Sequence, residues 1–362
     1  MDILYKRLLF FTMALVIGHM VTAQERVSKK VTKSYAFATG DELHLENKYG
    51  NVTVYGWSKN EVSITVHMTV THKKKENAIE LLHRIAPIIK SGDNYLSVSY
   101  EIADKNSGFF ANLFEKANPF DFDRSNVQID YNVHMPFKTI LNISNKFGDV
   151  LIEDWDGILI ADIQHGDIYI NRNITKAELS LKYGKLKAKN IINSNITLNN
   201  GELDMDDAYT MYINSSGSAI RIQSSSNLEL LSNKDEITLQ SVENIKGSLK
   251  FSNLVLHELK SNVMLDMKIA DFKIHQILNQ NSKIDIEQES SEVSLNISHF
   301  AHQFSAVLEE GLVRLPKTFY DVDSKMLDNG KKLREINAKY GNNGNGKITI
   351  TGKKGVVLLK EI

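Results

Sequence analysis

The chain has 362 residues, with 43 lysine and arginine residues against 44 aspartate and glutamate residues, so its formal net charge is −1 at pH 7. This balance gives no long-range field and excludes the strongly basic surface of a typical nucleic-acid-binding protein. The lack of any cysteine excludes disulfides, cysteine nucleophiles, thiolate metal sites and a lipid-modified cysteine. Only 4 prolines occur, which suits a chain made mostly of strands, because proline cannot donate to a β-ladder.

The first 23 residues have the pattern of a signal peptide, and we expect residues 1–23 to be removed on export. Lys6 and Arg7 give a basic start, residues 8–17 are almost entirely apolar, and small residues end at Ala23. No later stretch approaches 18 continuous apolar residues, so we expect no transmembrane anchor. The predicted location is the periplasm, the cell surface or the outside of the cell.

Residues 24–138 are predicted to form a β-rich N-terminal part with one helix. Apolar residues alternate with polar ones, which predicts two strands around a turn at 43–57 and one strand each at 62–70, 95–100 and 127–133. Over 73–90 the apolar spacing changes to that of a helix, which predicts one amphipathic helix.

An irregular loop is predicted at 107–125, and it carries five phenylalanines: Phe109, Phe110, Phe114, Phe120 and Phe122. Large apolar side chains on a loop are costly to expose, so this loop is a candidate interaction element. The competing interpretation is that the loop covers an open end of the fold, where bare strand edges invite aggregation.

A short phrase ending in glycine recurs along the chain, and it defines the architecture. It reads Asn-Lys-Tyr-Gly at 47–50, Asn-Lys-Phe-Gly at 145–148, Gln-His-Gly at 164–166, Lys-Tyr-Gly at 182–184 and Lys-Tyr-Gly at 339–341. The glycines at 148, 166 and 184 are 18 residues apart, and further glycines follow at spacings of 17 and 16. A fixed period near 18 in strand-type sequence predicts stacked coils.

The predicted fold is therefore all-β: a single-stranded β-solenoid, similar to a parallel β-helix, with coils of about 18 residues over 139–362. Each coil offers two apolar-x-apolar stretches around a turn, and we expect glycine to supply positive φ at that turn. Residues 326–333 are predicted to be a short helix or a loop. The last phrase, from Lys339 onward, is predicted to close the stack as a C-terminal cap.

The residues that precede the turn glycines form a candidate column: Phe147, His165 and Tyr183. One interpretation is an aromatic strip that binds a sugar or a peptide. The other, which we favour, is a stack of rings between coils, where each contact contributes about 0.5–1.5 kcal/mol beyond area burial.

The segment Leu-x-Ile-x-Asn-Lys-Phe-Gly-Asp-Val at 141–150, its relative at 43–52 and the repeated apolar-x-apolar-x-x-x-Gly coils carry a family resemblance. Over roughly 40–360 the chain resembles the bacterial putative-adhesin domain family, β-solenoid envelope proteins of unknown function. The resemblance implies a secreted or periplasmic repeat protein, with adhesion as its suggested role. It brings no catalytic residues and no cofactor. The helix at 73–90 and the loop at 107–125 depart from the plain repeat.

A second column follows the glycines: Asp149, Asp167, Lys185 and Glu202. Carbohydrate-active β-helix enzymes, such as polysaccharide lyases and hydrolases, place carboxylates on one outer face, so these residues are the candidate catalytic strip. The simpler interpretation is turn chemistry, with charges that pair across steps of about 4.8 Å.

Three aspartates, Asp204, Asp206 and Asp207, could supply oxygen ligands for calcium. No glycine-containing calcium loop surrounds them, and the histidines lack zinc-site spacing, so we expect neither a metal nor another cofactor.

The sequence thus favours an exported, non-enzymatic cell-envelope protein with an adhesin-like binding or scaffold surface. Its expected partner is an envelope protein or a glycan, and no nucleic acid. Two alternatives stay open: a carbohydrate-active β-helix enzyme, and an envelope accessory or sensing protein that uses the solenoid as a scaffold.

Overall fold

The computed structural model describes residues 24–103, 126–342 and 344–361, which are mostly β with one short helix. The predicted signal peptide at 1–23 and the predicted loop at 107–125, with its five phenylalanines, lie outside these residues. The helix is α2 (Lys75–Arg84). The first strands are β1 (Glu25–Ala36), β2 (Glu42–Lys48), β3 (Val52–Trp57), β4 (Glu61–His72), β5 (Ile85–Ser91), β6 (Tyr95–Ile102) and β7 (Val127–Pro136).

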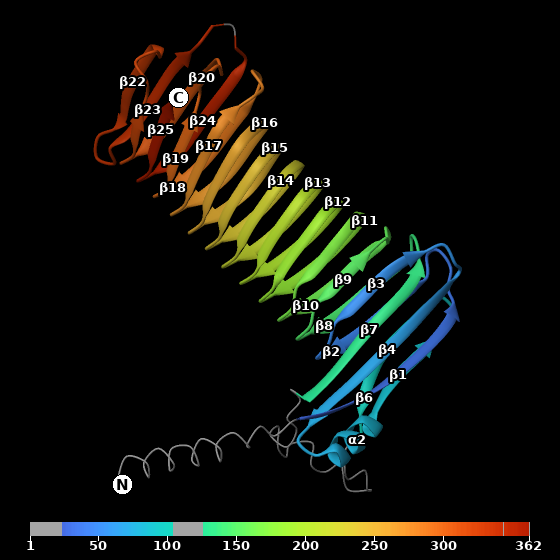
Figure 1. Ribbon diagram of the computed structural model, residues 1–362. Coiled ribbons are helices and arrows are strands. Elements are labelled where there is room, and N and C mark those ends of the chain that lie inside the picture. The colour runs from blue at the N-terminus through green and yellow to red at the C-terminus, as the bar shows by residue number, and fades with distance from the viewer. Residues whose placement is uncertain (1–23, 104–125, 343, 362) are drawn as a thin grey trace, which may run out of the picture.

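The remaining strands form the long body of the molecule (Figure 1). The middle strands are β8 (Ile140–Lys146), β9 (Val150–Glu153), β10 (Ile158–Gln164), β11 (Ile168–Lys182), β12 (Lys185–Asn199), β13 (Glu202–Ser216), β14 (Ala219–Asn233), β15 (Glu236–Lys250) and β16 (Asn253–Lys268). The last strands are β17 (Asp271–Ile277), β18 (Lys283–Glu289), β19 (Glu292–Asn296), β20 (His302–Glu309), β21 (Leu312–Arg314), β22 (Tyr320–Asp328), β23 (Leu333–Tyr340), β24 (Gly346–Lys353) and β25 (Val356–Lys360).

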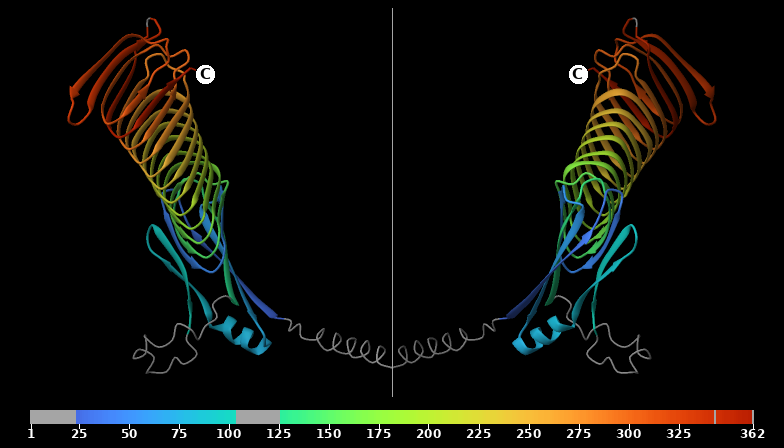
Figure 2. Two further views of the ribbon diagram at one scale, coloured as in Figure 1. Left: turned by 90° about the vertical axis from the view of Figure 1, so that its left-hand side faces the viewer. Right: turned by 90° about the vertical axis from the view of Figure 1, so that its right-hand side faces the viewer.

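Successive strands pair in parallel with a nearly constant register, so the chain forms a β-solenoid-like stack. Ile163 lies beside Leu181, and Leu181 beside Leu198, so the step is 18 and then 17 residues. Each strand from β11 to β16 is long enough to run along one side of the tube, bend, and return along the other (Figure 2). The predicted β class and the coil period are confirmed.

The core runs along the whole stack, because inward residues of each coil lie above those of the coil before. One such inward column contains Val52, Val150, Ile168, Leu186, Leu203, Ile220, Ile237, Leu254, Phe272, Val293 and Val357, all buried. Side chains of alternate residues point to opposite faces of a strand, which leaves the intervening polar residues outside.

The coils are out of sequence order at both ends of the stack. At the N-terminal end, β2 lies between β6 and β8, and β3 lies between β7 and β9. At the C-terminal end, β24 lies between β18 and β20, and β25 lies between β19 and β21. β2 and β3 near the N-terminal end, and β24 and β25 at the C-terminal end, are therefore each paired on both sides.

The helix is shorter than predicted, because residues 85–91 form β5 in place of its last third. Pro87 would remove a helical hydrogen bond and clash with the preceding turn, and the isoleucines around it favour a strand. β5 pairs antiparallel with β6. Within α2, Ala78 and Leu82 are buried, and the helix packs against β1 and β4.

The prediction of a short helix or loop at 326–333 is also wrong in part. Residues up to Asp328 belong to β22, which forms an antiparallel hairpin with β23. The intervening turn is closed by the Asp328 carboxylate, which accepts bonds from the Gly330 and Lys331 amides at 2.8 and 3.1 Å. Pairing with β23, which the local sequence does not reveal, decides for strand.

Positive φ lies one residue earlier than predicted in the regular corners. The angle is 57°, 55° and 57° at Phe147, His165 and Tyr183. Glycine follows for another reason, because successive corners approach closely: a Cβ on Gly166 would lie 2.0 Å from the carbonyl oxygen of Gly148. At Gly217, where φ is 65°, the prediction is right.

This close approach predicts that Gly166→Ala is strongly destabilising. The added carbon would force adjacent coils apart, and overpacking of this kind costs about 1–3 kcal/mol or more. Gly330→Ala is the matched control, because its nearest neighbour is the flexible Asp328 carboxylate at 3.3 Å. Denaturant midpoints followed by circular dichroism should fall for Gly166→Ala and stay near wild type for Gly330→Ala. Equal midpoints would contradict the close-approach explanation.

Candidate binding surface

Four rings form a continuous stack on one corner of the tube, which we call the corner column: Tyr49, Phe147, His165 and Tyr183. Neighbouring ring centroids are 5.5, 5.0 and 4.9 Å apart, and the planes differ by 10°, 4° and 16°. The predicted contacts among Phe147, His165 and Tyr183 are confirmed. Tyr49 joins them because β2 pairs with β8, a pairing that the repeated Lys-Tyr-Gly phrase hinted at without fixing.

The stack covers both faces of Phe147 and His165 and one face each of Tyr49 and Tyr183, and it leaves ring edges in solvent. Phe147 and Tyr183 are each 47% exposed. At the two ends of the column, the Nζ of Lys48 lies 4.9 Å from the Tyr49 centroid, and the Nζ of Lys182 lies 5.4 Å from that of Tyr183. A flat binding platform needs free ring faces, so this geometry favours the structural interpretation. Ligand binding by the column stays a prediction.

The predicted catalytic strip is also brought together, but two of its carboxylates, Asp149 and Asp167, bond to the backbone of the next coil. Asp149 Oδ1 accepts the Asp167 amide at 2.9 Å, and Asp167 Oδ1 accepts the Lys185 amide at 2.8 Å. The Tyr169 hydroxyl donates to Asp167 Oδ2 at 2.9 Å, and this bond raises the pKa of Tyr169. Lys185 forms an ion pair with Glu202 at 3.2 Å. The strip acts as a ladder between coils.

A buried carboxylate at Asp235, 1% exposed, replaces the corner glycine in a later coil. It accepts bonds from the Ser232 hydroxyl at 2.7 Å, the Ser218 amide at 2.8 Å and the Asn233 amide at 3.1 Å, and also from the Ser215 hydroxyl. Charged acceptors bonded this fully are held firmly in place. The sequence analysis missed this cluster, although Ser, Asp and Ser recur at the corner at spacings of 17 residues.

The three aspartates considered for calcium have other partners or lie apart. Asp204 lies 3.9 Å from the Nζ of Lys185, and Asp207 accepts a bond from Ser224. Within the described parts of the chain, no group of three His, Cys, Asp or Glu side chains is arranged to hold a metal ion.

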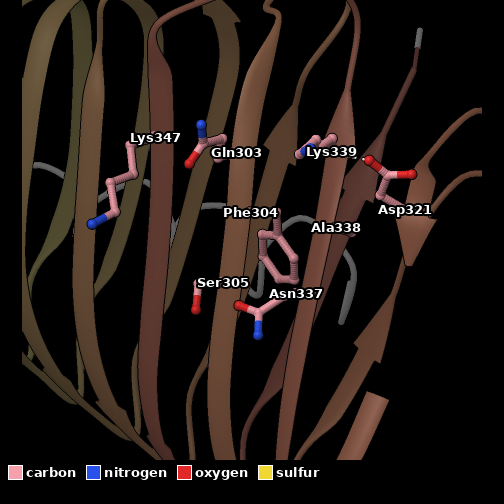
Figure 3. Close-up of a pocket in the computed structure, with 8 residues that line it drawn as sticks. All are labelled: Gln303, Phe304, Ser305, Asp321, Asn337, Ala338, Lys339 and Lys347. Atoms are coloured by element: carbon pink, nitrogen blue, oxygen red, sulfur yellow. Dashed lines mark hydrogen bonds and ion pairs between the residues drawn. The ribbon is translucent and has the colours of Figure 1, made fainter. Parts of the chain in front are cut away.

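A shallow hollow of about 160 Å³ with a mixed polar and apolar lining lies in the C-terminal cap, and we call it the cap hollow (Figure 3). Its lining residues come from β20, β22, β23 and β24: Gln303, Phe304, Ser305, Asp321, Asn337, Ala338, Lys339 and Lys347. Lys339 Nζ lies 3.0 Å from Asp321 Oδ2, and this bond raises the pKa of Lys339. The sequence could not reveal the hollow, because its strands meet only through out-of-order pairing.

A buried histidine, His302, lies beneath the cap. Its ring stacks on Phe300 with centroids 5.0 Å apart, and its Nδ1 lies 2.7 Å from the Phe300 carbonyl oxygen, so Nδ1 carries the proton and donates it. Phe319 and Tyr340 approach the same ring to 5.6 Å. Burial lowers the pKa of His302 to about 4.

Comparisons with known proteins give structural matches to bacterial putative adhesins over most of the chain. No protein-family model and no curated protein matches. Solved structures that match include a putative cell adhesion protein from Clostridium sporogenes, with 11% identity, 93% of this chain, 100% of that chain and a TM-score of 0.21. A putative adhesin from Bacteroides fragilis matches with 12% identity over 92% of this chain and 97% of that chain, at a TM-score of 0.24. A putative adhesin from Parabacteroides merdae matches with 11% identity over 92% of this chain and 97% of that chain, at a TM-score of 0.30.

These matches name the family that the sequence resembles, but identities and TM-scores this low carry no argument about function. The described residues include no helix that is long and apolar enough to span a membrane.

His302 predicts a loss of stability in acid. Its pKa falls from 6.5 to about 4 on folding, so the unfolded chain binds more protons between these values. Above about pH 6.5, His302 is neutral in both states and does not change the free energy of unfolding. As the pH falls, the unfolded chain takes up the proton first, and by pH 4 the free energy of unfolding has dropped by roughly 3 kcal/mol. Denaturant midpoints measured from pH 7.5 to 4 should fall less for His302→Phe than for wild type. The exposed control His67→Phe should keep the wild-type slope, and equal slopes for all three proteins would contradict this assignment.

The ladder role of Asp167 predicts different effects for two substitutions. Asp167→Asn keeps an oxygen for the Lys185 amide and should change stability little. Asp167→Ala leaves that amide without its acceptor and should cost about 1 kcal/mol. Urea unfolding of the two variants measures the difference, and equal stabilities would show that the bond contributes nothing.

Proposed function

We propose that the chain is an exported, non-enzymatic protein of the bacterial cell envelope, whose outer surface binds an envelope protein or a glycan in an adhesin-like way. The observation that carries the proposal is the regular stack, which orders outward side chains into straight columns on a rigid body. The corner column and the Asp149–Asp167 ladder are examples of this order. A long surface with a repeating chemistry suits an extended partner.

Within this surface, the cap hollow is the favoured contact for a glycan. The amides of Gln303 and Asn337, the hydroxyl of Ser305 and the ammonium of Lys347 line one concavity. Polar groups placed around a hollow give orientation and specificity to a ligand. At about 160 Å³, the hollow is smaller than typical pockets of roughly 300–1,000 Å³, so it fits one sugar unit of a longer chain.

The enzyme alternative is disfavoured by the bonds that the candidate carboxylates make. A general acid or base must reach a substrate proton, whereas Asp149 and Asp167 each hold a backbone amide of the next coil. The accessory or sensing alternative uses the same stack as a scaffold, and it differs in requiring a protein partner.

The test is a glycan array and an envelope pull-down with the full-length exported protein, with reducing-sugar release measured in parallel. We expect binding without turnover. Lys347→Ala and Gln303→Ala should each weaken binding about tenfold, because each removes a hydrogen bond to the ligand. Lys187→Ala, on an outer face away from the hollow, is the matched control and should bind as wild type.

Other results would redirect the proposal. Sugar release that is lost in Asp167→Asn would make the protein a β-helix enzyme. Capture of an envelope protein with no glycan binding would favour the accessory role. Glycan binding that ignores both hollow substitutions would return attention to the corner column.

A further inference from the structure

One side of the sheet extends past the last coil. β20 belongs to the outermost coil, and β23 and then β22 continue the sheet beyond it in antiparallel pairing. On the opposite side of the tube, β21 pairs with β25 alone among the described strands. We call β22 and β23 the C-terminal overhang, and Figure 2 shows this hairpin projecting beyond the tube.

The N-terminal end has a similar overhang, but it is covered and guarded. β4 and then β1 continue the sheet past β7, and α2 packs against both of them. The edge strand β1 carries exposed Lys29, Lys30 and Lys33. Such lysines discourage pairing between edge strands, since two copies would bring like charges together.

The C-terminal overhang has no such cover within the described residues. All 9 residues of β22 are exposed, including Val322 at 55%, Leu327 at 45% and Met326 at 38%. β23 lies on one edge of β22, and no other described strand pairs with it. An exposed strand with apolar side chains and a free edge is a template for another strand.

The central stretch of β22, residues 322–326, is complementary to itself, and this identifies the occupant. We infer that two copies of the chain pair antiparallel through β22, about a two-fold axis at Ser324. In that register Val322 lies opposite the partner's Met326, and Asp323 lies opposite the partner's Lys325. Symmetry makes each contact occur twice, as an isologous interface requires.

Between Val322 and Met326, both faces of the paired strands are then complementary. Alternate residues share a face, so two Val–Met pairs gather on one face and two Asp–Lys pairs on the other. Within one copy, Asp323 lies opposite Asn337 and Lys325 opposite Glu335 on β23. Asp321 of β22 is paired with Lys339, but neither Asp323 nor Lys325 forms an ion pair with another described residue, so both are available to a partner.

Two features of β22 that disfavour pairing with unrelated strands, its register shifts and Lys325, are compatible with this self-pairing. The register of β22 against β23 shifts between Tyr320 and Asp323 and again between Met326 and Asp328. The regular stretch between the shifts is centred near Ser324, where the two-fold axis lies. Lys325 repels a basic strand and would lose hydration against an apolar one, but it meets a carboxylate in the self-register.

The consequence is an end-to-end dimer. Strands are added along the direction in which coils stack, so the C-terminal ends meet and the two N-terminal ends lie far apart. The pairing does not depend on the proposed glycan binding, and failure of either leaves the other intact.

The first test is sedimentation equilibrium of the full-length exported protein over a range of concentrations. Wild type should show a monomer–dimer equilibrium. Asp323→Lys and Lys325→Asp should each weaken it about tenfold or more, since each places like charges opposite in two symmetric pairs. The double variant, which exchanges the two charges, should restore the dimer. A wild-type protein that stays monomeric, or a dimer that none of these variants weakens, would overturn the inference.

A single thiol tests the register directly, because the chain has no cysteine of its own. Residues directly opposite on paired strands have Cα atoms about 4.5–5.5 Å apart, within disulfide range. Ser324→Cys should therefore give a disulfide-linked dimer on mild oxidation, at least tenfold faster than the control Lys331→Cys in the hairpin turn. Equal rates would exclude the proposed axis.

Discussion

The parallel backbone ladder between coils is the constraint on which the other features depend. It keeps a step of 17 or 18 residues from β10 to β16 and so places chemically similar residues one above another. The corners must then approach as closely as the strands do, which leaves no room for a Cβ at Gly148, Gly166 or Gly184. The ring before each glycine accepts a left-handed backbone, at a cost of about 1–2 kcal/mol, and gains a stacking partner from the next coil.

The same ladder explains why the polar side chains that follow the corner glycines have a structural role. A side chain that follows the corner glycine lies beside a backbone amide of the next coil, so Asn51, Asp149 and Asp167 each accept one. When glycine is replaced, polar side chains take over the corner, and the Asp235 cluster is the fullest example. The repeat thus directs its corner groups toward the neighbouring coil, whereas the cap hollow lies where the repeat is interrupted.

The regular repeat is interrupted at the two ends of the stack, where the outermost strands have edges that could pair with other chains. At the N-terminal end, α2 covers the overhang and lysines line the edge strand. At the C-terminal end, the sheet continues through β23 and β22, which no other described element covers, beside the cap hollow and the buried His302. This asymmetry directs attention to the C-terminal cap for partner binding and for self-association alike.

Sequence by itself determined the β class, the coil period and the stacking of Phe147, His165 and Tyr183, because each follows from spacing along a local repeat. It could not determine the order of coils at the ends, where Tyr49 joins Phe147 and β24 inserts between β18 and β20. The sequence also wrongly assigned positive φ to the regular corner glycines, because the close approach of backbones between coils does not show in a single segment. It wrongly assigned a helix to residues 85–90, because their pairing with β6 does not show there either. The cap hollow and the free edge of β22 were decided by tertiary structure alone, because pairing between distant segments sets which strands meet and which edge remains open.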